Sequence, residues 1–113
     1  MAEIPYEQIK ADGARTARYQ WLNLGDADDG TPVIVGERPD GSLQVEGTFA
    51  GATVVLEGSN DGVNWVTLTD DQGAAVSFTA AGLNMFVARP WKVRPLTSGG
   101  GGAAINATLL LGS

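Results

Sequence analysis

Turn-forming residues divide this chain into short segments, and their spacing constrains the fold more than any other feature of the sequence. From residue 18 onward, short runs rich in branched and aromatic residues alternate with clusters of Gly, Asp, Asn and Pro. Such runs are typical of β-strands. No window keeps a 3.6-residue period long enough for a helix to cross over between parallel strands. The pattern therefore predicts antiparallel strands.

The clearest strand is the segment 43–49, in which Leu43, Val45 and Phe49 share one face while polar residues occupy the other. This alternation indicates one buried and one solvated face. We expect strands over 18–24, 31–35, 43–49, 53–59, 64–69, 75–79, 85–89, 92–97 and 104–111. The fold class predicted is an all-β antiparallel β-sandwich, of jelly-roll or related Greek-key type.

The first 17 residues lack this pattern. Their sizeable apolar residues are Ile4, Tyr6 and Ile9, spread among charged and small residues without a period of either two or 3.6. We expect an extended N-terminal arm over residues 1–17, with room for one helical turn, and a sandwich domain over 18–113. A floppy terminus is the alternative for the arm.

The composition argues against catalysis. Among the 113 residues there is no histidine and no cysteine, so the usual general base, the thiolate nucleophile and the commonest ligands of transition metals are missing. The net charge of −6 disfavours nucleic acid and anionic membrane surfaces as partners. We predict a protein that is not an enzyme and uses no cofactor. The lack of cysteine also fits assembly in a bacterial cytoplasm.

The acidic turns of the chain are candidates for a metal site or a catalytic site. The loop 26–30 carries three aspartates, and Glu37 stands where a calcium-binding loop would need its last ligand. The residues between them look like a strand instead of a helix, so we predict an acidic turn and no metal site. Asp61, Asp70 and Asp71 lie in exposed turns, which do not separate two pKa values as paired catalytic carboxylates require.

The string 59–65 resembles hairpins of discoidin-like carbohydrate-binding domains and the Asp-box of sialidases. Here Asp61 can accept backbone hydrogen bonds and Trp65 can pack over the hairpin. We favour this structural role over sugar binding. A second string, 89–95, places three of the seven basic residues around Trp91. It is read either as a protein interface or as an edge strand protected by Pro and charge.

Several runs together resemble small virion proteins of bacteriophages, and cover most of residues 18–111. They are the segments 19–21, 30–33, 47–68, 71–73, 77–82 and 93–95. The size of the chain is similar to that of capsid cement (decoration) proteins. This resemblance implies a homo-oligomer, a dimer or trimer, on the outer capsid surface, where it bridges copies of the major capsid protein. The contacts expected are Ile4, Tyr6, Ile9 and Arg15 of the arm, and Arg89, Trp91, Lys92 and Arg94. A sugar-binding adhesion module and a tail or baseplate subunit remain alternatives.

Overall fold

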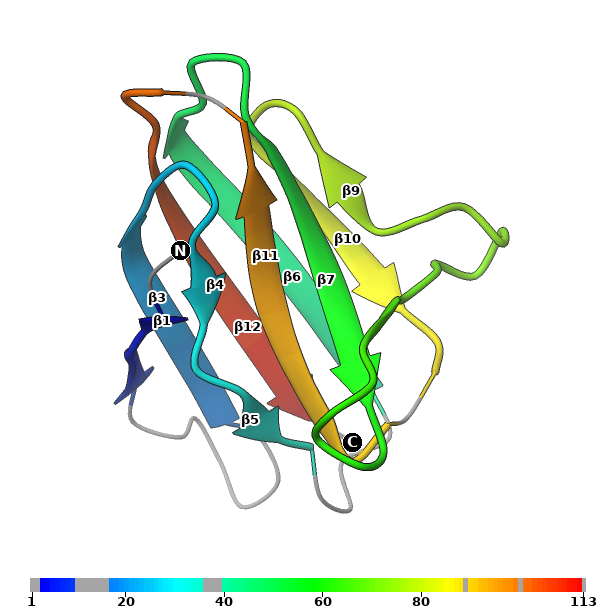
Figure 1. The fold of residues 1–113 in the computed structure, drawn as a ribbon. Helices are drawn as coiled ribbons and strands as arrows, with labels where there is room; N and C mark the ends of the chain where they lie inside the picture. Colours follow the sequence, from blue (N-terminus) through cyan, green and yellow to red (C-terminus); the bar gives the residue numbers. More distant parts are fainter. Residues whose placement is uncertain (1–2, 10–16, 36–39, 89, 100, 113) are drawn as a thin grey trace.

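Two β-sheets pack face to face in the computed structural model, which describes residues 3–9, 17–35, 40–88, 90–99 and 101–112 (Figure 1). The five-stranded sheet has the order β10-β6-β12-β3-β2, and all its pairs are antiparallel. Its strands are β2 (Tyr6–Ile9), β3 (Ala17–Leu24), β6 (Asp40–Thr48), β10 (Gly82–Phe86) and β12 (Ala104–Gly112).

The seven-stranded sheet has the order β1-β4-β11-β7-β8, with β5 also paired to β11 and β9 to β7. Its strands are β1 (Glu3–Ile4), β4 (Asp29–Gly30), β5 (Val33–Ile34), β7 (Thr53–Ser59), β8 (Val66–Thr67), β9 (Ser77–Phe78) and β11 (Lys92–Ser98). The consecutive strands β10, β11 and β12 alternate between the two sheets. The predicted all-β sandwich is confirmed.

The core lies between the sheets and follows the two-residue period of the strands. Along β12 every second residue from Ile105 to Leu111 is buried, whereas Leu110 points outward. Trp21 of β3 is fully buried among them. The remaining large members of the core include Leu24, Val33, Leu43, Val45, Val54, Leu56, Val76, Phe86, Val93 and Leu109. Burying such side chains contributes about 1.5–3 kcal/mol each.

A proline inside β11 is tolerated because the sheet is interrupted beside it. Pro95 lies opposite Leu56 of β7, whose N–H and C=O bond to Val76 and Leu68 on the other side. Pro95 therefore has no ladder bond to make toward β7. On the opposite side of β11, β5 pairs with the residues before Pro95 and β4 pairs with the residue after it. The missing N–H of proline thus faces the gap between β4 and β5.

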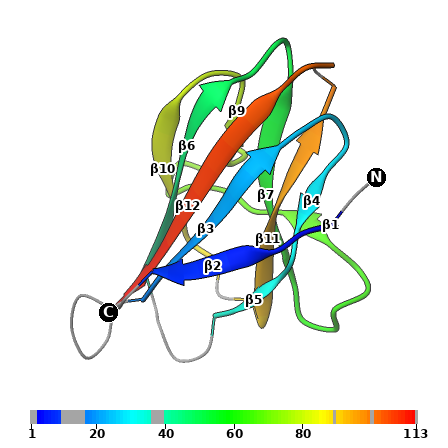
Figure 2. The same ribbon diagram turned by 90° about the vertical axis from the view of Figure 1, so that its left-hand side faces the viewer.

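The described part of the N-terminal segment, residues 3–9, forms two strands that belong to the sandwich. β1 pairs in parallel with β4 of one sheet, and β2 pairs with β3 of the other. Figure 2 shows β2 running along the edge of the five-stranded sheet beside β3. The chain passes from one sheet to the other at Pro5.

The observed strands differ from the predicted ranges where exposed residues obscure the pattern. The predicted strand 85–89 is found at Gly82–Phe86, because Val87 leaves the ladder and donates its N–H to Thr69 O (3.1 Å). The predicted strand 64–69 shortens to Val66–Thr67, and the predicted strand 31–35 shortens to Val33–Ile34. The strand β4 (Asp29–Gly30) lies before that range and was not predicted. In contrast, β7 covers the same residues as predicted.

Candidate functional site

The outer face of the five-stranded sheet carries aliphatic and uncharged polar side chains, together with Arg18 opposite Leu110 and Glu46 opposite Asn106. Its exposed apolar residues come from three strands: Leu22 from β3, Leu110 from β12, and Leu83 and Met85 from β10. The register places Leu83 in one row with Gln44, Thr108 and Gln20, and it places Met85 in the next row with Ser42, Leu110 and Arg18. Gln20 Nε2 donates to Thr108 Oγ1 (3.3 Å). Exposed apolar side chains gathered on one face are typical of interaction surfaces.

A shallow groove of about 270 Å³ lies at the β2 side of this face. It is lined by Ile4, Pro5, Tyr6, Gln20 and Leu22. This volume is below the roughly 300–1,000 Å³ of pockets that enclose small-molecule ligands. The groove therefore suits a side chain of a partner protein better than a free ligand.

Aromatic packing fixes the position of Tyr6 at the groove. Its ring stands edge-on to Tyr19, with centroids 5.2 Å apart, and to Trp21 at 6.2 Å. Such edge-to-face pairs contribute about 0.5–1.5 kcal/mol beyond the area they bury. Because Trp21 is part of the core, Tyr6 is held on a rigid support.

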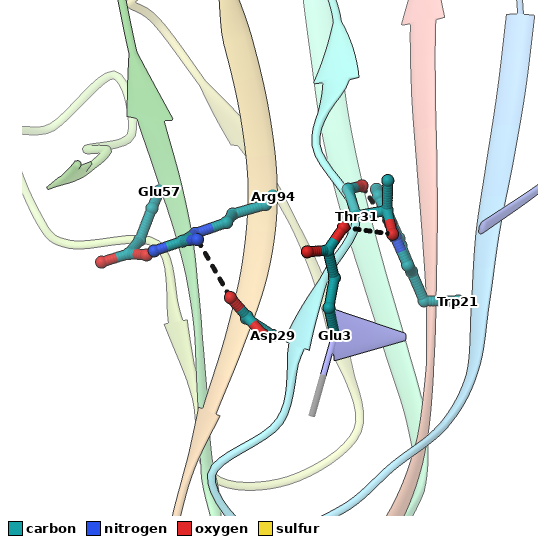
Figure 3. Close-up of polar contacts among 6 residues, drawn as sticks. All are labelled: Glu3, Trp21, Asp29, Thr31, Glu57 and Arg94. Atoms are coloured by element: carbon teal, nitrogen blue, oxygen red, sulfur yellow. Dashed lines mark hydrogen bonds and ion pairs between the residues drawn. The ribbon is translucent and has the colours of Figure 1, made fainter. Parts of the chain in front are cut away.

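Thr31 fastens the start of β1 to the sandwich (Figure 3). Its hydroxyl donates to Glu3 Oε2 (2.8 Å), and its N–H donates to Ile4 O (2.8 Å). Its carbonyl oxygen accepts from Trp21 Nε1 (3.1 Å), which satisfies the buried indole. One residue thus connects the N-terminal segment, the loop after β4 and the core.

Arg94 lies inside an ion-pair network instead of pointing to solvent (Figure 3). Its guanidinium contacts Asp29 Oδ2 at 3.0 Å and Glu57 Oε1 at 3.1 Å, and its charged end lies 4.1 Å from the ring centroid of Trp65. These contacts join β4, β7 and β11 with the hairpin after β7. Arg94 is therefore occupied within the fold, and it covers one face of the Trp65 ring.

Trp91 is the most prominent exposed aromatic side chain in the described part of the chain, with 45 % of its surface accessible. The ammonium group of Lys92 lies 4.2 Å from the centroid of the Trp91 ring. The backbone N–H of Trp91 donates to Asn60 Oδ1 (2.9 Å). Trp91 and Lys92 form a small exposed patch at the start of β11, which we call the Trp91 patch.

The predicted contact residues fall into separate groups. Ile4 and Tyr6 come together at the groove, while Trp91 and Lys92 form their own patch and Arg94 joins the ion-pair network. The backbone of Ile9 lies in β2. Its side chain, together with Arg15 and Arg89, lies outside what the structure describes.

Sequence reasoning missed the outer face of the five-stranded sheet. Leu110 stands within the run 109–111 of three leucines, which conceals the alternation of its strand. The strand that carries Leu83 and Met85 is predicted to start at residue 85, three residues after its observed start. Leu83 therefore lies before the predicted strand, and Met85 is its first residue. Partly exposed leucines do not by themselves indicate a surface. Only the strand register, which places them near Gln20 and Gln44, shows that these residues share one face.

The acidic turns are used for local structure. The carboxylate of Asp61 accepts from the N–H groups of Asn64 and Val63, from the Asn64 side chain and from Ser59 Oγ, and these bonds hold the pKa of Asp61 well below its ordinary value. Bonds from the Asn84 side chain and then from the N–H groups of Gln72 and Ala74 lower the pKa of Asp70.

Two of the three carboxylates of the loop 26–30 are engaged as well. Asp28 Oδ2 accepts from Gly25 N–H (2.7 Å), and Asp29 pairs with Arg94. Within the described ranges, no group of three or more Asp, Glu, His or Cys residues is arranged to hold a metal ion. Glu37 lies outside those ranges. None of the described residues forms a helix able to cross a membrane.

Comparison with known proteins identifies the fold only. No protein-family model matches the sequence, and no curated protein matches it. The crystal structure of YomS, an SPBc2 prophage-derived protein, superposes with a TM-score of 0.69 at 10% identity, covering 92% of this chain and 100% of that chain. The cupin domain of Schizosaccharomyces pombe Cnp3 gives 0.47 at 6% identity, over 96% of this chain and 60% of that chain. The likeness to YomS shows a shared β-sandwich fold.

Proposed function

We propose that this chain is a structural protein of a bacteriophage virion and, more specifically, a decoration protein that binds the outside of the head. Two independent lines support the virion role. The sequence resembles small phage virion proteins over most of the sandwich, and the fold is shared along the full length of a prophage-derived protein, YomS.

The observation that carries the binding role is the outer face of the five-stranded sheet. It combines four exposed apolar side chains with Gln20, Gln44 and Thr108. Single exposed apolar residues are ordinary, whereas a set that shares one sheet face across three strands is a feature of interaction surfaces. The groove at its edge adds Ile4 and Tyr6, two of the predicted contacts.

The proposed mechanism is mass action. A protein that binds only the assembled, expanded shell stabilises that shell by its binding free energy, repeated over many sites. Bridging two copies of the major capsid protein adds avidity, and a dimer or trimer of the decoration protein would increase it further. No chemical step by this chain is required.

The test is to mix the purified protein with mature capsids that lack it, pellet the particles, and measure the bound copies and the temperature of capsid disruption. We expect saturable binding and a higher disruption temperature. Leu110→Glu, at the centre of the proposed face, should weaken binding. Val66→Glu, on the seven-stranded sheet, is the matched control and should bind as the unchanged protein does.

Binding to purified tails with none to heads would contradict the head assignment and favour a tail or baseplate subunit. Binding to glycans with none to either particle would favour the sugar-binding alternative. Light scattering on the free protein would measure whether it is a dimer or a trimer.

A further inference from the structure

The two edges of the five-stranded sheet differ in how their backbone groups are used. At the β10 edge the N–H of Met85 donates to Asn84 Oδ1 (2.9 Å), and the N–H of Val87 donates to Thr69 O (3.1 Å). Both amides point away from β6. Local partners therefore occupy this edge. At the opposite edge, no strand in the described part of the chain pairs with the outer side of β2.

The register determines which backbone groups of β2 face outward. In an antiparallel ladder, residues alternate between facing one neighbouring strand and facing the other. The backbone groups of Met85 face away from β6, so those of its partner Ser42 face β12. Leu110, the partner of Ser42 in β12, then faces β6. Arg18, the partner of Leu110 in β3, faces β2, where its own partner is Ile9. Ile9 must therefore face β3. Since the groups alternate along β2, those of Tyr6 and Gln8 point outward.

We propose that β2 is a docking edge for an extended strand of a partner protein, which adds to the five-stranded sheet and places an apolar side chain in the adjacent groove. This inference rests on the proposed function, in which the partner is the major capsid protein. Tyr6 and Gln8 each present an N–H and a C=O, and such groups are complementary to an added strand.

Three features of this edge support an added strand. The sequence of β2, Tyr-Glu-Gln-Ile, contains no Lys and no Pro, the residues that most commonly protect an exposed edge, and Glu7 is its one charged residue. The groove next to Tyr6 has the volume for one side chain and is lined mainly by apolar residues. The packing of Tyr6 against Tyr19 holds the edge in place before binding, which lowers the entropic cost of association.

The charge of the chain favours a different protein over a second copy as the occupant. Two copies that pair through β2 would bring together molecules of formal charge −6 each. A neutral or basic strand avoids this repulsion. The partner segment is therefore expected to be extended, without excess acidic residues, and to carry one large apolar residue.

The test compares Gln8→Pro with Gln8→Val in the capsid pelleting assay. Gln8→Pro removes an outward N–H and no ladder bond to β3, whereas Gln8→Val keeps the N–H. We expect the proline variant to melt within a few degrees of the unchanged protein and to lose about tenfold or more in affinity, as expected for a lost hydrogen bond that leaves its partner group buried. The valine variant should bind normally.

Hydrogen exchange on the bound protein gives a second readout that does not depend on a variant. Amides in residues 6–8 should exchange more slowly on capsids, while those of β10 should not change. Binding of the unchanged protein without protection at 6–8, or full affinity of Gln8→Pro, would overturn strand addition and leave the decoration role standing. No binding to capsids by the unchanged protein would overturn both.

Discussion

Arg94 shows how a residue chosen from the sequence as a contact can serve the fold instead. Its charge and its place near Trp91 suggested an interface. Its partners Asp29 and Glu57 lie 65 and 37 positions away in the sequence, so no local pattern could reveal them. Asp61 differs, because its side chain accepts hydrogen bonds only from residues within three positions, and its structural role could be predicted.

Replacing Arg94 should therefore affect stability more than binding. Arg94→Ala leaves two carboxylates, each about one-eighth exposed, without their cation. We expect a loss of about 2–3 kcal/mol in the free energy of unfolding, below the 3–5 kcal/mol of a fully buried pair. The stability of Arg94→Lys should lie between that of the unchanged protein and that of Arg94→Ala, because one ammonium group cannot bind both carboxylates as a guanidinium does. Urea denaturation measures these values.

The matched control for this prediction is Lys92→Ala, which removes an exposed cation from the same strand. Its contact with Trp91 is partly solvated, so the expected change is within about 1 kcal/mol. Equal losses for Arg94→Ala and Lys92→Ala would contradict the role given to the ion-pair network.

Asp61 makes stability depend on pH in a defined direction. Hydrogen bonds to the ionised carboxylate hold its pKa in the folded state below the value in the unfolded chain, about 3.9. The stabilisation is therefore complete above about pH 4 and is lost as pH falls below that value. Asp61→Asn should lower the melting temperature at pH 7 and flatten its decline between about pH 4 and 2. The exposed Asp71→Asn should leave this part of the curve unchanged.

At the scale of strands, the sequence predicts elements well where one face is buried and the other is solvated. The strands β7 and β12 follow this rule, and their limits agree with prediction to within a residue. β2 could not be predicted, because residues 1–17 show no alternation and this strand of four residues is fixed by its pairing with β3 instead of by a pattern of its own. Edge strands are specified by tertiary context.

Gly47 is required by the pairing of β6 with β12. Its φ of +116° disfavours any side chain, and a Cβ there would overlap the carbonyl oxygen of Ala104. We expect Gly47→Ala to cost about 2–4 kcal/mol, from backbone strain and overpacking together. Gly51 also has positive φ (+86°) but open space around it. Gly51→Ala should cost only about 1 kcal/mol in thermal or urea unfolding, and equal effects would contradict the steric argument.

At the scale of the whole molecule, composition excluded several functions but could not place the interaction surface. The absence of histidine and cysteine and the charge of −6 are properties of the entire chain. They do not reveal that uncharged residues from β3, β6, β10 and β12 meet on one face, since this depends on the order of the strands. The two candidate surfaces, this face with its groove and the Trp91 patch, differ in charge. The charges of Arg18 and Glu46 on the sheet face are opposite, whereas the Trp91 patch carries the single cation Lys92, and that difference decides between them.

Salt dependence of capsid binding distinguishes these two surfaces. Binding through the groove and the neighbouring leucines, which carry no charge, should change less than about threefold between roughly 0.05 M and 0.5 M salt, a range over which the Debye length falls from about 14 Å to about 4 Å. Screening should even help slightly at the lower end, because the net charge of −6 opposes crowding of many copies on one shell. Binding through Lys92 and Trp91 would instead weaken by tenfold or more, and Lys92→Ala would remove that sensitivity. A steep salt dependence abolished by Lys92→Ala would therefore move the interface to the Trp91 patch, whereas a flat dependence combined with loss of binding in Leu110→Glu assigns it to the five-stranded sheet.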